Sequence, residues 1–238
     1  MTRALAVCAV LALLAAGPPS VEQLGRTRAA IVLPDGPPAG SIVLLPGGTT
    51  LLKIDAAGNT DSGNFVIRIR EALVAAGFAI VYVDYPGDLR PVVARMRAIA
   101  RPVFFLGTSN GTAVATRAAA VLGTDGPDGL VLTSTVTGTS NQYPYAVTPA
   151  VVSHIAVPVL FVHNRNDGCR VSPPAAIAGL IAHFPSSSDV TRVDVSSATT
   201  PNDPCGPFAP HGYLGVEGDV TAAIVEWMRA HGAQGTPP

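Results

Sequence analysis

The sequence predicts an α/β domain with a mainly parallel central sheet and helices on both faces. Three observations indicate this fold class. Strand-like and helix-like segments alternate along most of the chain. Several strand-like segments are apolar throughout, which is typical of strands buried on both faces. Finally, 48% of the 238 residues are hydrophobic and only 13% are charged, so the chain can bury a large core.

In the first half, two short β-branched segments, 29–33 and 41–45, flank a turn rich in proline and glycine. They are predicted to form a hairpin or adjacent strands. Residues 64–76 have helical spacing, and Gly77 ends the helix. The next elements are predicted to be an apolar strand at 78–83, a helix at 89–100, whose first turn tolerates Pro91, a strand at 103–106 and a helix at 110–122.

The second half continues the alternation. Its predicted elements are strands at 129–133, 157–162 and 190–195 and helices at 174–183 and 218–231. Trp227 and Met228 on the last helix are interpreted as core residues. The interval between the strands at 129–133 and 157–162 has room for a loop and one helix. We therefore expect no lid domain over the site.

The N-terminus has the pattern of a secretory signal. Arg3 precedes an unbroken apolar run at 4–16, and Ala15, Ala16 and Gly17 supply small residues for cleavage. The run is shorter than the roughly 20 residues that a membrane-spanning helix needs. We expect a signal peptide at 1–20, a single domain at 21–238, and export to the periplasm or the medium. The alternative is a buried N-terminal helix.

The cysteines fit an exported protein. Cys8 would leave with the signal, and Cys169 and Cys205 would remain. An even number of cysteines in an oxidising compartment predicts a disulfide, which would stabilise the fold by roughly 3–4 kcal/mol. Two unpaired buried thiols are the alternative.

Charge excludes some partners. The formal net charge is −1 and the chain has no basic run, which disfavours nucleic acid and anionic membrane surfaces as partners. After signal cleavage no stable membrane insertion is expected. The sequence leaves the oligomeric state open.

The most informative motif is Gly107-Thr108-Ser109-Asn110-Gly111, a Gly-x-Ser-x-Gly sequence between an apolar strand and a helix. This layout is typical of a nucleophile elbow, in which a sharp turn lifts a serine hydroxyl out of a parallel sheet. The pentapeptide alone is common, but its place between strand and helix makes it informative. Ser109 is therefore the candidate nucleophile.

A serine nucleophile needs a base, and the base needs a group that orients it. Asp167 follows the predicted strand at 157–162 and is the candidate acid; it could instead be a turn aspartate. His211 lies in a loop rich in proline and glycine before the last helix and is the candidate base. The other histidines lie beside the acid, in the short insertion or at helix ends. A Cys169–Cys205 bridge would tie the acid loop to the histidine loop.

The oxyanion of a tetrahedral intermediate needs two N–H donors. One is expected from the backbone of Asn110, after the nucleophile, and the other from the turn Pro46-Gly47-Gly48, which ends an early strand. Gly48 is the first candidate and Thr49 the second. A plain tight turn is the alternative.

From its first strand pair to its last helix, the chain resembles the α/β-hydrolase superfamily, in particular exported bacterial serine hydrolases. The resemblance implies Ser109 as nucleophile, Asp167 as acid, His211 as base and Pro46-Gly47-Gly48 as the oxyanion loop. This loop differs from the lipase-type His-Gly-Gly-Gly sequence because proline comes first. No metal or organic cofactor is implied.

These features predict a serine hydrolase that cleaves small-molecule carboxylic esters through an acyl-enzyme. A peptidase or amidase with the same triad, and a binding protein that has kept only the fold, are the alternatives. Tyr143, Tyr145 and Tyr213 could line the substrate pocket or serve only as surface or packing residues.

Overall fold

A computed structural model describes residues 17–49, 51–140, 144–185, 189–198 and 202–233. The strands are Ser20–Leu24 (β1), Thr27–Val32 (β2), Ser41–Leu45 (β3), Ala79–Val83 (β4), Val103–Thr108 (β5), Gly129–Thr133 (β6), Val159–Asn164 (β7) and Val190–Val195 (β8). The helices are Phe65–Arg68 (α1), Arg70–Ala75 (α2), Arg90–Ile99 (α3), Asn110–Leu122 (α4), Pro149–Val152 (α5), Ile177–Ile181 (α6) and Glu217–Ala230 (α7). Three short 3₁₀ turns are Gly123–Asp125 (η1), Pro174–Ala176 (η2) and Pro210–Gly212 (η3).

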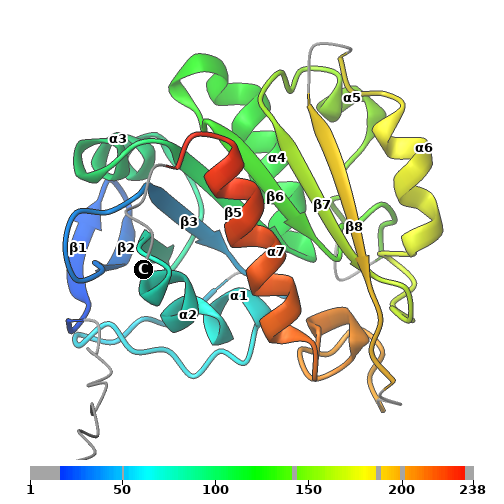
Figure 1. The fold of residues 1–238 in the computed structure, drawn as a ribbon, viewed down its shortest axis with the longest axis horizontal. Coiled ribbons are helices and arrows are strands. Elements are labelled where there is room, and N and C mark those ends of the chain that lie inside the picture. Colours follow the sequence, from blue (N-terminus) through cyan, green and yellow to red (C-terminus); the bar gives the residue numbers. More distant parts are fainter. Residues whose placement is uncertain (1–16, 50, 141–143, 186–188, 199–201, 234–238) are drawn as a thin grey trace, which may run out of the picture.

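The described strands form one eight-stranded sheet with the order β1-β2-β4-β3-β5-β6-β7-β8 (Figure 1). The strands from β3 to β8 pair in parallel, whereas β1 and β2 add an antiparallel edge. Every residue of β3, β4, β5, β6 and β7 is buried, as their continuous apolar sequences predict. The predicted fold class is confirmed.

The first strand pairing was predicted wrongly. Segments 29–33 and 41–45 form neither a hairpin nor adjacent strands, because β4 lies between β2 and β3. The hairpin joins β1 to β2 around Gly25, whose φ of +62° suits a glycine. The sequence of β1, Ser-Val-Glu-Gln-Leu, has little apolar character, so the sequence pattern did not predict a strand there. Most of the predicted signal segment, residues 1–16, lies outside the described residues, and Ser20 already belongs to β1.

Helices cover both faces of the sheet (Figure 1). One apolar cluster packs the sheet against α3, α4, α5 and α6, and a second packs it against α1, α2 and α7. Trp227 and Met228 belong to the second cluster, as predicted. Between β6 and β7 the described residues form only one short helix, α5.

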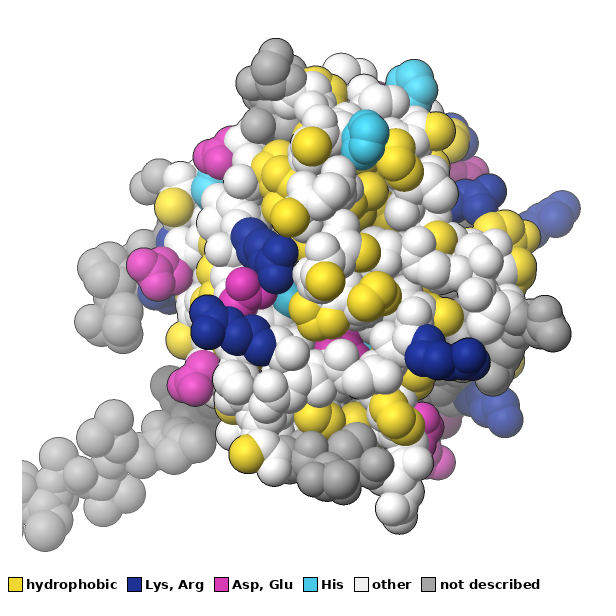
Figure 2. All heavy atoms as spheres, turned by 90° about the vertical axis from the view of Figure 1, so that its right-hand side faces the viewer, with side chains coloured by type: hydrophobic (Ala, Val, Ile, Leu, Met, Phe, Trp, Pro, Cys, Tyr) yellow, Lys and Arg dark blue, Asp and Glu magenta, His cyan; other side chains and the backbone are white. Residues whose placement is uncertain are grey.

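Charged residues make up 13% of the sequence. On the side with α5, α6 and β8, Figure 2 shows charged side chains scattered among apolar and uncharged polar ones. Within the described part of the chain, none of the helices combines the length and the apolar character needed to cross a membrane.

The turn from β5 into α4 requires glycine on both sides of Ser109. A Cβ on Gly111 would lie 1.9 Å from the carbonyl oxygen of Leu45, the last residue of β3. A Cβ on Gly107 would lie 2.6 Å from the carbonyl oxygen of Gly111. Real Cβ atoms do not approach backbone so closely, so the two glycines allow α4 to begin directly against the ends of β3 and β5.

Replacing Gly111 by alanine should therefore destabilise the fold. We expect Gly111→Ala to lower the free energy of unfolding by about 2–3 kcal/mol, because backbone rather than a flexible side chain must move. Gly218→Ala is the matched control: it lies in α7 with open space around its Cβ position and should be neutral or stabilising by up to about 1 kcal/mol. Urea denaturation measures both, and a Gly111→Ala protein as stable as the wild type would contradict this packing account.

Candidate active site

Ser109 occupies the strained turn that its motif predicts. It lies between Thr108, the end of β5, and Asn110, the start of α4, with φ 54° and ψ −122°. Such a backbone conformation is costly for a residue other than glycine and is typical of functional sites. Its N–H donates to the Thr133 carbonyl at 3.0 Å, which ties the turn to the end of β6. The side chain is partly exposed and borders a cavity of about 300 Å³.

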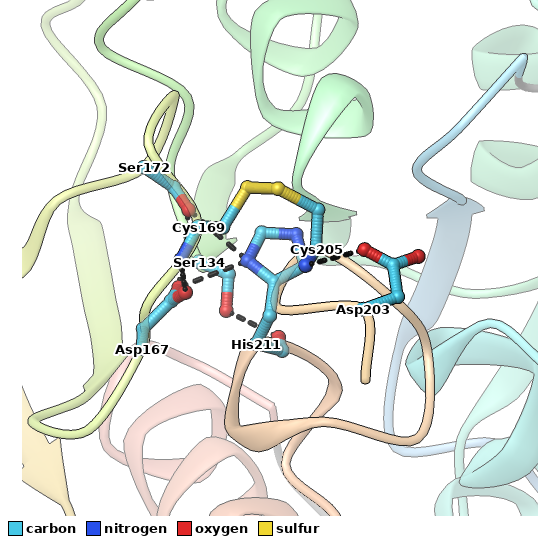
Figure 3. Close-up of a disulfide and its surroundings, with 7 residues drawn as sticks. All are labelled: Ser134, Asp167, Cys169, Ser172, Asp203, Cys205 and His211. Carbon is cyan, nitrogen blue, oxygen red and sulfur yellow. Dashed lines mark hydrogen bonds and ion pairs between the residues drawn. A yellow bond between two sulfur atoms is a disulfide. The ribbon is translucent and has the colours of Figure 1, made fainter. Parts of the chain in front are cut away.

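Asp167 and His211 meet as predicted. The imidazole Nδ1 of His211 lies 2.9 Å from Asp167 Oδ2, and both side chains are almost completely buried (Figure 3). The other carboxylate oxygen, Oδ1, accepts the N–H of Cys169 at 2.9 Å. Because an ionised carboxylate only accepts hydrogen bonds, Nδ1 carries the proton and Nε2 keeps its lone pair.

The other nitrogen of the His211 ring, Nε2, is the candidate base atom, and no hydrogen bond joins it to the Ser109 hydroxyl. The Nε2 atom is buried and has no hydrogen-bond partner among the described residues. His211 and Ser109 border the same cavity. The structure thus brings all three residues of the predicted triad to one site, with the orienting hydrogen bond formed and the base atom unoccupied.

Sequence reasoning missed Ser172, which supports the Asp167–His211 pair. Its hydroxyl donates to Asp167 Oδ2 at 3.1 Å and lies 3.0 Å from His211 Nδ1 (Figure 3). The side chain is fully buried. Nothing in the sequence around Ser172 distinguishes it from an ordinary loop serine.

The candidate oxyanion donors flank the nucleophile. Gly48 has a φ of +67° and borders the catalytic cavity, and the side-chain amide of Asn110 donates to its carbonyl at 2.9 Å. No hydrogen bond joins the backbone N–H of Gly48 or of Asn110 to an acceptor among the described residues. Gly48 borders the catalytic cavity and Asn110 does not, and both N–H groups are without a partner among the described residues, so both stay candidates for the oxyanion role.

A buried hydrogen-bond network holds the loop that carries His211. The Ser134 hydroxyl donates to the His211 carbonyl at 2.6 Å, and the Ser134 N–H donates to the Tyr213 hydroxyl at 2.8 Å. That hydroxyl in turn donates to the Val162 carbonyl at 2.6 Å. Tyr213 is completely buried, which raises the pKa of its hydroxyl. Tyr213 is thus an anchor of the loop and does not border the catalytic cavity, whereas Tyr143 lies outside the described residues.

Arg68 also holds the loop that carries His211. Its guanidinium donates to the carbonyls of Gly63, Pro207 and Gly212 at 2.6–2.8 Å. It also pairs with Glu217 at 2.8 Å. Burial raises the pKa of the Glu217 carboxyl, but hydrogen bonds from its own backbone N–H, from Arg68 and from the Gly215 N–H together lower it. These contacts join α1 to the backbone on both sides of His211. They connect residues far apart in sequence, so no local pattern predicts them.

The predicted disulfide is present. Cys169 and Cys205 are joined with a Cα–Cα distance of 4.7 Å, and Figure 3 shows the bridge beside the His211 ring. Cys169 is two residues from Asp167, and Cys205 is six residues from His211. The bridge therefore links the loop of the acid to the loop of the base.

His163 is excluded as the base by its environment. Its Nε2 accepts the N–H of Thr135 at 3.1 Å, and the residue does not border the catalytic cavity. Burial lowers the pKa of its imidazole to about 4, so the ring is neutral at pH 7. Among the described residues, no group of histidine, cysteine, aspartate and glutamate side chains could hold a metal ion.

Similar solved structures exist although the sequence is distant from them. No protein-family model matches the chain, and no curated protein sequence matches it significantly. Est1E from Butyrivibrio proteoclasticus is 14% identical with a TM-score of 0.61, over 92% of this chain and 100% of that protein.

Two peptidases are similarly close. The proline iminopeptidase of Mycobacterium smegmatis is 12% identical with a TM-score of 0.62, over 90% of this chain and 98% of that one. The acylaminoacyl peptidase of Pyrococcus horikoshii is 11% identical with a TM-score of 0.62, over 95% of this chain and 43% of that one. At these identities the comparisons show the fold.

Removing the disulfide should reduce activity as well as stability. We expect the double variant Cys169→Ser, Cys205→Ser to lose roughly 3–4 kcal/mol of unfolding free energy. Its kcat should also fall at temperatures where circular dichroism shows it folded, because Asp167 and His211 lose their common restraint. The wild-type protein after reduction by dithiothreitol should behave in the same way. An unchanged kcat in the folded variant would contradict the proposed role of the bridge.

His163 should make the protein sensitive to acid. Between its ordinary pKa of 6.5 and about 4, the unfolded chain binds a proton that the folded chain does not. The free energy of unfolding therefore falls as pH decreases through this range, by about 1.4 kcal/mol per pH unit from this residue alone. In His163→Gln, whose amide oxygen can still accept the Thr135 N–H, this part of the slope should disappear. Equal slopes for the two proteins in urea denaturation would refute the assignment.

Proposed function

The chain has the α/β-hydrolase fold, and we propose that it is a serine hydrolase that cleaves carboxylic esters through an acyl-enzyme. One observation carries the proposal. The imidazole of His211 is held through Nδ1 by Asp167 at 2.9 Å, its Nε2 has no hydrogen-bond partner among the described residues, and the residue borders the same cavity as Ser109. A base fixed in this tautomer beside a strained serine is the arrangement that nucleophilic acyl transfer requires.

The reaction follows from the positions of these groups. His211 Nε2 takes the proton of the Ser109 hydroxyl while Oγ attacks the carbonyl carbon, and Asp167 stabilises the resulting imidazolium. The negative charge on the carbonyl oxygen is bound by the N–H groups of Gly48 and Asn110. Nε2 then protonates the departing alcohol, which leaves the acyl group on Ser109. Water, deprotonated by the same nitrogen, releases the acid and regenerates the serine.

Export is part of the proposal. The Cys169–Cys205 disulfide is typical of proteins from oxidising compartments, and the N-terminal sequence has the pattern of a secretory signal. Both features support a periplasmic or secreted enzyme. The residues of the signal pattern up to 16 lie outside those that the structure describes.

A fluorophosphonate probe tests the nucleophile. The wild type should be labelled at Ser109, because Nε2 activates its hydroxyl, and Ser109→Ala should not be labelled. Ser172→Ala is the matched control, since its hydroxyl contacts His211 only at Nδ1, and it should still be labelled. Folded wild-type protein that resists the probe would favour a binding protein that has kept only the fold.

Matched ester and amide substrates distinguish an esterase from a peptidase or amidase. We expect p-nitrophenyl acetate to be hydrolysed with a higher kcat/KM than acetyl-p-nitroanilide and peptide amides, and Ser109→Ala to lower kcat by about 10⁴-fold or more. Two similar structures are peptidases by name, so faster amide cleavage would replace the esterase proposal with a peptidase one.

A further inference from the structure

A second and larger cavity adjoins the catalytic one. It has a volume of about 760 Å³, and the catalytic cavity about 300 Å³. Gly48 and Thr49 border both cavities, so this short segment separates one from the other. Asn110 borders the second cavity and holds the Gly48 carbonyl through its side-chain amide. The second cavity therefore begins at the candidate oxyanion donors.

The walls of the second cavity are mostly apolar. Its long side is the face of α4 that carries Ala113, Val114, Ala118, Val121 and Leu122. Two tyrosines from other segments, Tyr85 and Tyr145, also line it. Val121, Tyr85 and Tyr145 are 78%, 63% and 54% exposed, so large apolar surfaces stand open to solvent along one groove. Such a grouping is typical of a binding site.

Three charged residues, Asp88, Arg90 and Arg117, border this groove. The Arg117 guanidinium lies 4.6 Å from the centre of the Tyr145 ring, and Arg90 pairs with Asp88 at 3.2 Å. Of the carboxylates in the described part of the chain, only that of Asp88 borders the cavity. The groove therefore offers an occupant apolar contacts and aromatic faces, and its one carboxylate is paired with Arg90.

The position of His211 decides which half of a substrate each cavity takes. The departing alcohol must reach Nε2 to be protonated, and His211 borders only the catalytic cavity. The acyl group remains on Ser109 and extends away from the base. A long acyl group that passes over Gly48 and Thr49 enters the groove along α4.

We propose that the groove along α4 binds the acyl chain of the substrate, and that the enzyme prefers esters of extended apolar acids over those of short acids. This inference rests on the proposed function, because it assumes acylation of Ser109. Ala118, Val121, Tyr85 and Tyr145 determine acyl-chain length, and none of them takes part in the chemistry.

Blocking the groove tests the inference. In the wild type, kcat/KM for p-nitrophenyl octanoate should exceed that for p-nitrophenyl acetate. Ala118→Phe should lower the octanoate-to-acetate ratio by about 10-fold or more, because the octanoyl chain loses its binding site and the acetyl group does not reach the groove. Ala222→Phe, an exposed position on α7 away from both cavities, is the matched control and should leave the ratio at its wild-type value.

Val121→Asp gives a second route should Ala118→Phe fail to fold. The side chain of Val121 is largely exposed, so a charge there spares the core and makes the groove unfavourable for an alkyl chain. It should lower the same ratio. An unchanged octanoate-to-acetate ratio in the folded variants would overturn the assignment of the groove to the acyl chain. The proposed function would still stand if these variants hydrolyse p-nitrophenyl acetate. A wild type that hydrolyses neither ester would overturn both.

Discussion

The hydrogen bond between Asp167 and His211 is the interaction on which the site depends. It places the proton on Nδ1 and leaves Nε2 as the acceptor. Asp167 lies in a loop after β7 and His211 in the short turn η3, and neither belongs to a long helix or strand that would fix its backbone. The disulfide, the Ser172 hydroxyl and the donors of Arg68 supply that restraint. The chemistry of the site is therefore determined by the contacts that hold two loops together.

Backbone strain is concentrated around the same residues. Among the described residues other than glycine, four have a positive φ, and three of these are Ser109, Ser134 and Tyr213. Ser109 is the candidate nucleophile, and the other two anchor the histidine loop by hydrogen bonds. Such conformations persist only where the surrounding structure enforces them. Three features hold these conformations in place: the buried ends of the sheet strands, the close packing of Gly111 on Leu45 and the hydrogen bonds of the Tyr213 hydroxyl.

Local patterns and residue chemistry predicted much of this structure, including the disulfide and the Asp167–His211 pair, but not the strand order or the contacts of Arg68. Helix α4 has the bounds that its sequence indicates, and the strand–turn–helix motif identified Ser109, because both depend on neighbouring residues. Asp167 and His211 follow from their place after strands. The position of β4 between β2 and β3 depends on pairing partners that no single segment specifies. Arg68 and Glu217 meet across 149 positions of sequence, so local sequence patterns could not reveal their pairing.

The central claim is that Ser109, His211 and Asp167 act as one coupled unit, and proton NMR tests it directly. The Nδ1–H proton of a histidine bound to a carboxylate resonates far downfield of the amide protons. We predict such a resonance in the wild type, its loss in Asp167→Asn, and a clear shift when an organophosphorus group is attached to Ser109. A downfield resonance that does not respond to modification of Ser109, or its absence from the folded wild type, would contradict the coupling.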